Sequence, residues 1–162
     1  MPEVVRVAAR QLRLNGMGVG TEKTFFKVYV AGFYLERKTT DARTAITSDQ
    51  VKRIALVMLR DVSRQKFVQA VEKGMVLNSG PAISTLRARL NVLEESLPAL
   101  KKGDILDFTY IPGTGTLVRG QGRELTIPGK DFADALLSVW LGPKAANSVL
   151  RQALLSGVVA PS

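Results

Sequence analysis

The N-terminal part of the chain alternates apolar and polar side chains, a pattern typical of β-strands. Residues 3–14 place valines and leucines between arginines, which predicts one strand. Residues 24–35 are rich in aromatic and β-branched side chains on both faces, which predicts a central strand covered on both sides. Residues 51–62 predict a further strand, on which Met58 shares an apolar face with Arg60 near its end.

Helical periodicity follows these strands. Ser63 is a typical N-cap for a helix whose apolar side chains recur every fourth residue from Phe67 to Met75. Residues 78–81 break that helix, and Pro81 suits the first turn of a second one. The second helix has the clearest stripe in the chain, with apolar residues at intervals of three and four between residues 83 and 100, and Pro98 is expected to end or kink it.

The C-terminal part of the chain predicts short strands and then helices. Strands are expected at residues 105–111, 114–119 and 123–127, and helices around residues 132–140 and 149–154. Strands, helices, strands and helices in this order exclude a regular parallel βαβ sheet. The pattern predicts one α+β domain over residues 1–162, an antiparallel sheet with helices packed on one face.

Three glycines at alternate positions, Gly16, Gly18 and Gly20, interrupt the first part of this pattern. A dinucleotide-binding loop would need a helix directly after it, so that the helix N-terminus faces a pyrophosphate. The segment that follows predicts a strand instead. The glycines therefore indicate a bulge or a close backbone approach within a sheet.

The chain has no cysteine and no histidine. Their absence excludes disulfides, thiol nucleophiles, Ser-His and Cys-His catalysis and the commonest zinc ligands. No segment has the spacing of a calcium-binding loop. We therefore expect no metal, no cofactor and no disulfide, and any chemistry must come from Arg, Lys, Tyr, Thr, Asp or Glu.

The net charge of +9 comes from 23 basic and 14 acidic residues. The basic residues occur singly or in pairs, without interleaved aromatic residues, which disfavours nucleic-acid binding. The charge would suit a small anionic ligand. No apolar segment reaches the length of a membrane span, and no signal peptide is present, so the protein is either cytosolic or has had a leader replaced by Met1.

Several motifs together resemble the chalcone isomerases and the bacterial chalcone-isomerase-like proteins. The resemblance extends over residues 10–157 and is carried by a glycine loop, a central strand, an Arg-Asp pair, a turn and a C-terminal helix, at residues 16–19, 26–36, 60–62, 102–104 and 132–142. It implies an open-faced β-sandwich. The family includes true isomerases and non-catalytic members that bind fatty acids. Its bacterial members commonly carry an export leader, which implies periplasmic residence, with the cytoplasm as the alternative.

The resemblance also implies that the isomerase's catalytic side chains are missing. The catalytic arginine of the enzymes matches Gly20, and a threonine that polarises the substrate carbonyl matches Tyr29. A polar residue of the C-terminal helix matches Val139. The remaining tyrosine and asparagine fall near Ser79 and Leu86. Lys23 and Lys27 are the candidate replacement cations, and the interpretation leans towards a non-catalytic protein.

We therefore expect an elongated apolar or fatty-acid-like ligand to bind between the sheet and its helices. Tyr29 and Tyr110 are candidate polar contacts, and Arg60 is a candidate partner for a carboxylate. The residues expected at this site are Lys27, Tyr29, Met58, Arg60, Tyr110 and Val139. Two alternatives remain open at this point, an enzyme acting on an unknown substrate and a structural or interaction module without a pocket. The sequence does not set the oligomeric state.

Overall fold

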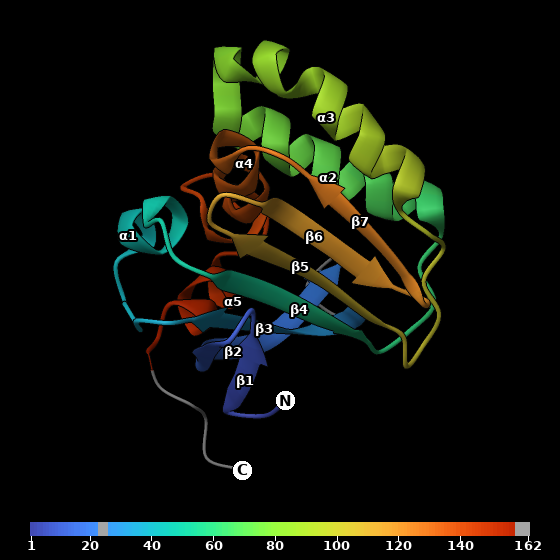
Figure 1. The fold of residues 1–162 in the computed structure, drawn as a ribbon. Coiled ribbons are helices and arrows are strands. Elements are labelled where there is room, and N and C mark those ends of the chain that lie inside the picture. The colour runs from blue at the N-terminus through green and yellow to red at the C-terminus, as the bar shows by residue number, and fades with distance from the viewer. Residues whose placement is uncertain (23–25, 158–162) are drawn as a thin grey trace.

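The computed structural model describes residues 1–22 and 26–157, and its centre is one seven-stranded antiparallel sheet. The strands lie in sequence order from one edge to the other, so every strand pairs with its neighbours along the chain (Figure 1). Their bounds are β1 Val4–Val7, β2 Arg10–Glu22, β3 Phe26–Leu35, β4 Lys52–Met58, β5 Ile105–Ile111, β6 Gly115–Gly120 and β7 Arg123–Ile127. The predicted antiparallel sheet and its C-terminal meander are confirmed.

The helices lie on one side of this curled sheet, as predicted (Figure 1). They are α1 Ala42–Thr47, α2 Arg64–Ser79, α3 Ile83–Ser96, α4 Lys130–Leu141 and α5 Ser148–Leu154, with a 3₁₀ turn at Gly80–Ala82. The main core lies between the two layers, where the ring centroids of Phe108 on β5 and Trp140 on α4 are 5.7 Å apart. None of the described helices is long and apolar enough to span a bilayer.

The first predicted strand is in fact a hairpin. Residues 3–14 divide into β1 and the start of β2, with Val7 paired to Arg10. Ala8 and Ala9 form the turn in the left-handed region, at φ of 49° and 63°. Such a turn normally carries Asn or Gly. Because both turn residues are alanines, the sequence did not indicate a hairpin here. The part of the predicted central strand at residues 24 and 25 lies outside the described residues.

One helix was missed, and another ends before its apolar stripe does. The six-residue α1 was not predicted, although Asp41 caps it by accepting a hydrogen bond from the Thr44 backbone N–H at 2.9 Å. Helix α3 ends at Ser96, before the end of the apolar stripe. Leu97 and Leu100 stay buried, at 1% exposure each, but in irregular backbone. Pro98 was expected to end or kink this helix, and the helix does end just before it, while the apolar spacing correctly predicted that both leucines are buried.

The glycines of β2 permit a close helix–sheet contact. A Cβ built on Gly16 would overlap the Ala153 carbonyl oxygen of α5, and one on Gly18 would lie 2.9 Å from the Ala153 Cβ. Glycine is required wherever two backbones approach this closely. The predicted close approach is confirmed, and it seats α5 beside the end of β2.

Candidate functional site

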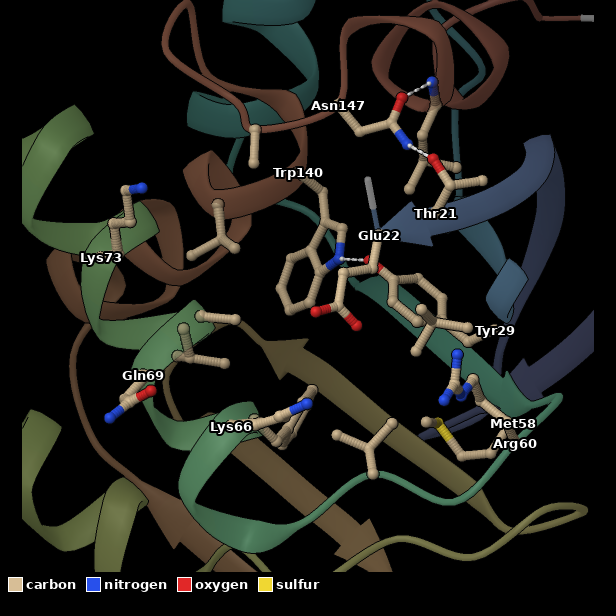
Figure 2. A pocket seen from close by; sticks show the side chains of 18 of the residues that line it. Thr21, Glu22, Tyr29, Met58, Arg60, Lys66, Gln69, Lys73, Trp140 and Asn147 are labelled. Carbon is tan, nitrogen blue, oxygen red and sulfur yellow. Dashed lines mark hydrogen bonds between the residues drawn. The ribbon is translucent and has the colours of Figure 1, made fainter. Parts of the chain in front are cut away.

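A cavity of about 580 Å³ lies where β2 and β4 end and β3 begins, beneath helices α2, α4 and α5 (Figure 2). Its size falls within the range usual for small-ligand pockets. The most buried part of its wall is apolar and comes from four different elements. These side chains are Met58, Phe67, Val71, Trp140 and Leu150, with at most 7% exposure each.

Tyr29 brings a polar group to this wall. Its hydroxyl oxygen accepts a hydrogen bond from the Trp140 indole Nε1–H at 3.1 Å (Figure 2). Burial raises the pKa of Tyr29, an effect that the hydrogen bond from Trp140 opposes. The hydroxyl is therefore neutral near pH 7, and its own proton is available to an acceptor in the cavity.

Tyr29 also explains why residue 20 is a glycine. The two residues are direct partners in the β2–β3 ladder. A Cβ built on Gly20 would lie closer than 3.0 Å to three carbons of the Tyr29 ring. The ring therefore covers the Gly20 backbone and leaves no room for a side chain there.

The rim of the cavity is polar and mostly exposed. Lys66, Gln69 and Lys73 follow one face of α2, and Arg60 lies on the opposite side of the opening beside Met58 (Figure 2). Glu22 and Asp61 are the acidic residues of the described lining. The rim is therefore charged, whereas the buried wall is apolar.

Asn147 joins the α4–α5 loop to the sheet at this rim. Its Oδ1 accepts the Leu150 backbone N–H at 2.9 Å and so caps α5. Its Nδ2 donates to the Thr21 hydroxyl at 3.1 Å (Figure 2). This side chain holds the start of α5 against the end of β2 and forms one edge of the opening.

The structure brings four of the six sequence-predicted residues together. Tyr29, Met58, Arg60 and Val139 all line the cavity. Arg60 was predicted to lie within a strand at residues 51–62, but the observed strand β4 ends two residues before it, at Met58. Its guanidinium carbon lies 5.3 Å from the centroid of the Phe26 ring.

Lys27 does not line the cavity, and a β-bulge is the reason. Gly20 pairs with Tyr29, but Thr21 pairs with Lys27, so Val28 is an extra residue opposite this step. Val28 lines the cavity and Lys27 is exposed. Simple alternation along the strand placed Lys27 and Tyr29 on one face, and the bulge interrupts that alternation. Lys23, the other candidate cation, lies outside the described residues.

Tyr110 lies at a different place, near α1. Its hydroxyl donates to Asp49 at 2.6 Å, and its pKa is raised by burial and by that carboxylate. The Lys52 ammonium lies 5.4 Å from the Tyr110 ring centroid and donates to the Ile46 carbonyl at 2.6 Å. This buried lysine, 3.7 Å from Asp134, ties β4 to α1 and α4.

Several lining residues were not predicted from the sequence. Trp140 was assigned only to the helix stripe, and the polar face of α2 was not considered as part of a site. One signal was available, because Lys66, Gln69 and Lys73 recur at helical spacing beside the apolar stripe of Phe67 and Val71. Within residues 1–22 and 26–157, no group of three acidic side chains is arranged to hold a metal ion.

Comparison with known proteins agrees with this architecture. Residues 1–156 match the model of the chalcone isomerase-like family, so the chain belongs to that family. A crystal structure of a fatty-acid binding protein from Arabidopsis thaliana is similar in fold, with a TM-score of 0.72 at 14% sequence identity. The similarity covers 96% of this chain and 90% of the plant protein. No curated protein sequence matches the chain.

Proposed function

We propose that this protein is a non-catalytic member of its family that binds an elongated apolar ligand, of the fatty-acid type, in the cavity beside Tyr29. The observation that carries the proposal is the cavity itself, about 580 Å³ of space with a buried apolar wall. Burial of hydrocarbon against such a wall is favourable by ~25 cal/mol per Å². The fold shared with a plant fatty-acid binding protein supports the same class of ligand.

The contact between Tyr29 and Gly20 supports the non-catalytic part of the proposal. Closure of a chalcone needs a cation beside the phenolate and the developing enolate. The ring of Tyr29 fills the space that a cationic side chain at residue 20 would need. The hydrogen bond described for the Tyr29 hydroxyl comes from the neutral indole N–H of Trp140, whereas the Arg60 guanidinium lies at the rim over the Phe26 ring.

Native mass spectrometry tests the proposal. The purified protein, stripped of lipid and then mixed with an equimolar set of saturated fatty acids, should gain the mass of one fatty acid per chain. Ala70→Phe places a large side chain at the lining of the cavity, and Ala88→Phe makes the same change on an exposed face of α3 away from it. Retention should fall in the first variant and persist in the second. A protein that retains none of the acids would refute the proposal.

We also propose periplasmic residence for the natural protein. The absence of cysteine fits an oxidising compartment, in which a free thiol would be a liability. Fractionation of cells that express the gene from its own start site tests this, and recovery from the cytoplasmic fraction alone would contradict it.

A further inference from the structure

The distribution of charge around the cavity bears on how a ligand would lie in it. The deepest lining side chains are apolar, and the charged ones are exposed at the rim. Met58, Val71 and Leu150 are 2%, 1% and 2% exposed, whereas Lys66 and Lys73 are exposed to solvent. An amphiphile that enters this cavity therefore meets cations at the opening and hydrocarbon inside.

The three basic side chains of the rim are not neutralised by the protein. Within the described part of the chain, Arg60, Lys66 and Lys73 form no ion pair. The contact recorded for the Arg60 guanidinium is with the face of Phe26. Of the two acidic lining residues, Asp61 already accepts the Lys102 backbone N–H at 2.9 Å. The three basic side chains outnumber the two described lining carboxylates, Glu22 and Asp61, so the rim has a net positive charge for an anion.

The inner wall has far fewer groups that could stabilise an anion. Its polar group is the Tyr29 hydroxyl, which is neutral and has one proton to donate. Transfer of a carboxylate from water to an apolar site costs several kcal/mol unless charges or several hydrogen bonds compensate. A single neutral donor does not supply that compensation, but it suits a hydroxyl or carbonyl oxygen within a chain.

We propose that the cavity binds its ligand with the anionic end outward, between Arg60 and Lys66, and with the hydrocarbon chain directed inward to Trp140. This inference rests on the proposed ligand-binding function and adds an orientation and a chemical class to it. The class is a long-chain amphiphile with a terminal carboxylate or phosphate. Because the head group stays at the rim, its size is not limited by the cavity.

Trp140 makes the orientation measurable, because it is the chain's single tryptophan and lies in the buried wall. Bromine quenches indole fluorescence only at short range. The probes are 2-bromohexadecanoic acid and 16-bromohexadecanoic acid, with unlabelled hexadecanoic acid as the reference. The proposal expects strong quenching by the 16-bromo acid and weak quenching by the 2-bromo acid at equal saturation.

The reverse order, with stronger quenching by the 2-bromo acid, would overturn the orientation while leaving the binding function intact. Equal quenching by both acids would also overturn it, because the chain would then lie in both directions. If calorimetry detects no binding of the unlabelled acid, the underlying function fails and the orientation fails with it. These outcomes are distinguishable because saturation is measured independently of quenching.

A pair of variants tests the rim cations separately. Arg60→Gln combined with Lys66→Gln should weaken hexadecanoate binding by about tenfold, equivalent to ~1.4 kcal/mol, and leave hexadecanol binding unchanged. The matched control is Lys101→Gln combined with Lys102→Gln, two exposed lysines outside the cavity. Equal loss for the acid and the alcohol, or loss of acid binding in Tyr29→Phe alone, would contradict the outward orientation.

Discussion

The aromatic ring of Tyr29 lies over Gly20, its partner on the neighbouring strand, and occupies the space of any side chain at that position. The two residues therefore depend on each other. A large side chain at residue 20 requires a small one at residue 29. The resemblance to the isomerases matches an arginine to Gly20 and a threonine to Tyr29, which is the opposite combination of sizes.

A double-mutant cycle measures this dependence. Gly20→Ala should destabilise the protein by about 1–3 kcal/mol, because the new Cβ must displace the Tyr29 ring from a packed site. The same change made in a Tyr29→Thr background should cost much less, giving a coupling energy of at least ~1 kcal/mol. Urea unfolding of the four proteins gives the values. Additive effects would show that the two side chains do not compete for space.

The hydrogen bond from Trp140 to Tyr29 should make a measurable contribution to the free energy of unfolding. Tyr29→Phe should lower the free energy of unfolding by about 1 kcal/mol, because the buried indole N–H loses its acceptor. It should also shift the Trp140 emission. The double variant Tyr29→Phe, Trp140→Phe serves as the control, because no indole donor is then left unpaired. A Tyr29→Phe protein as stable as the parent would contradict this role.

Lys52 should make stability depend on pH. Burial lowers its pKa to about 8 despite the nearby Asp134, whereas an unfolded lysine titrates near ~10.4. Between these values the unfolded chain binds the proton and the folded one does not, so stability rises with pH. The rise from pH 8 to 10 should be about 2 kcal/mol. Below pH 8 both states are protonated and this contribution is constant.

Urea unfolding of Lys52→Met across the same pH range isolates the effect, because this variant should lack the rise. Lys101→Met, a change at an exposed lysine, should retain it. If the parent protein and Lys52→Met showed the same pH profile, Lys52 would not be the titrating group.

Glu22 lies on the rim beside the proposed anion site, so its removal should favour an anionic ligand. Glu22→Gln should tighten hexadecanoate binding about threefold at low salt, a change of ~0.6 kcal/mol that is usual for an exposed charge. The gain should fade at high salt because exposed charges are screened. Hexadecanol binding should not change, and neither should hexadecanoate binding in Glu95→Gln, at an exposed residue of α3. Weaker binding of the acid by Glu22→Gln would contradict the proposed site.

Most of the fold could be predicted because the hydrophobic periodicity and the capping and turn residues indicate the same elements along this chain. Ser63 does cap α2 through its hydroxyl, which accepts the Lys66 backbone N–H at 3.2 Å, and the meander of β5 to β7 follows its turn residues. The hairpin at Ala8 and Ala9 was missed because alanine carries no turn signal. Local patterns predict elements well where the residue types themselves require the conformation.

The site was harder to predict than the fold. Tyr29, Met58 and Arg60 were named as candidates for one site and do line the same cavity, but the bulge at Val28 separates Lys27 from Tyr29, with which strand alternation had grouped it. A bulge leaves no reliable mark in a single sequence. Trp140 and Tyr29 are 111 residues apart in the sequence, so only the tertiary structure shows that their side chains are in contact.

The central claim is that the cavity beside Tyr29 holds a long apolar ligand, and Trp140 reports on it directly. Titration of the lipid-free protein with hexadecanoic acid should change the Trp140 emission saturably, with one site per chain. Ala70→Phe should weaken binding by about tenfold or more, ~1.4 kcal/mol, and Ala88→Phe should leave it unchanged. An emission spectrum that stays constant up to the solubility limit of the acid, or identical titrations for Ala70→Phe and the parent protein, would contradict the claim.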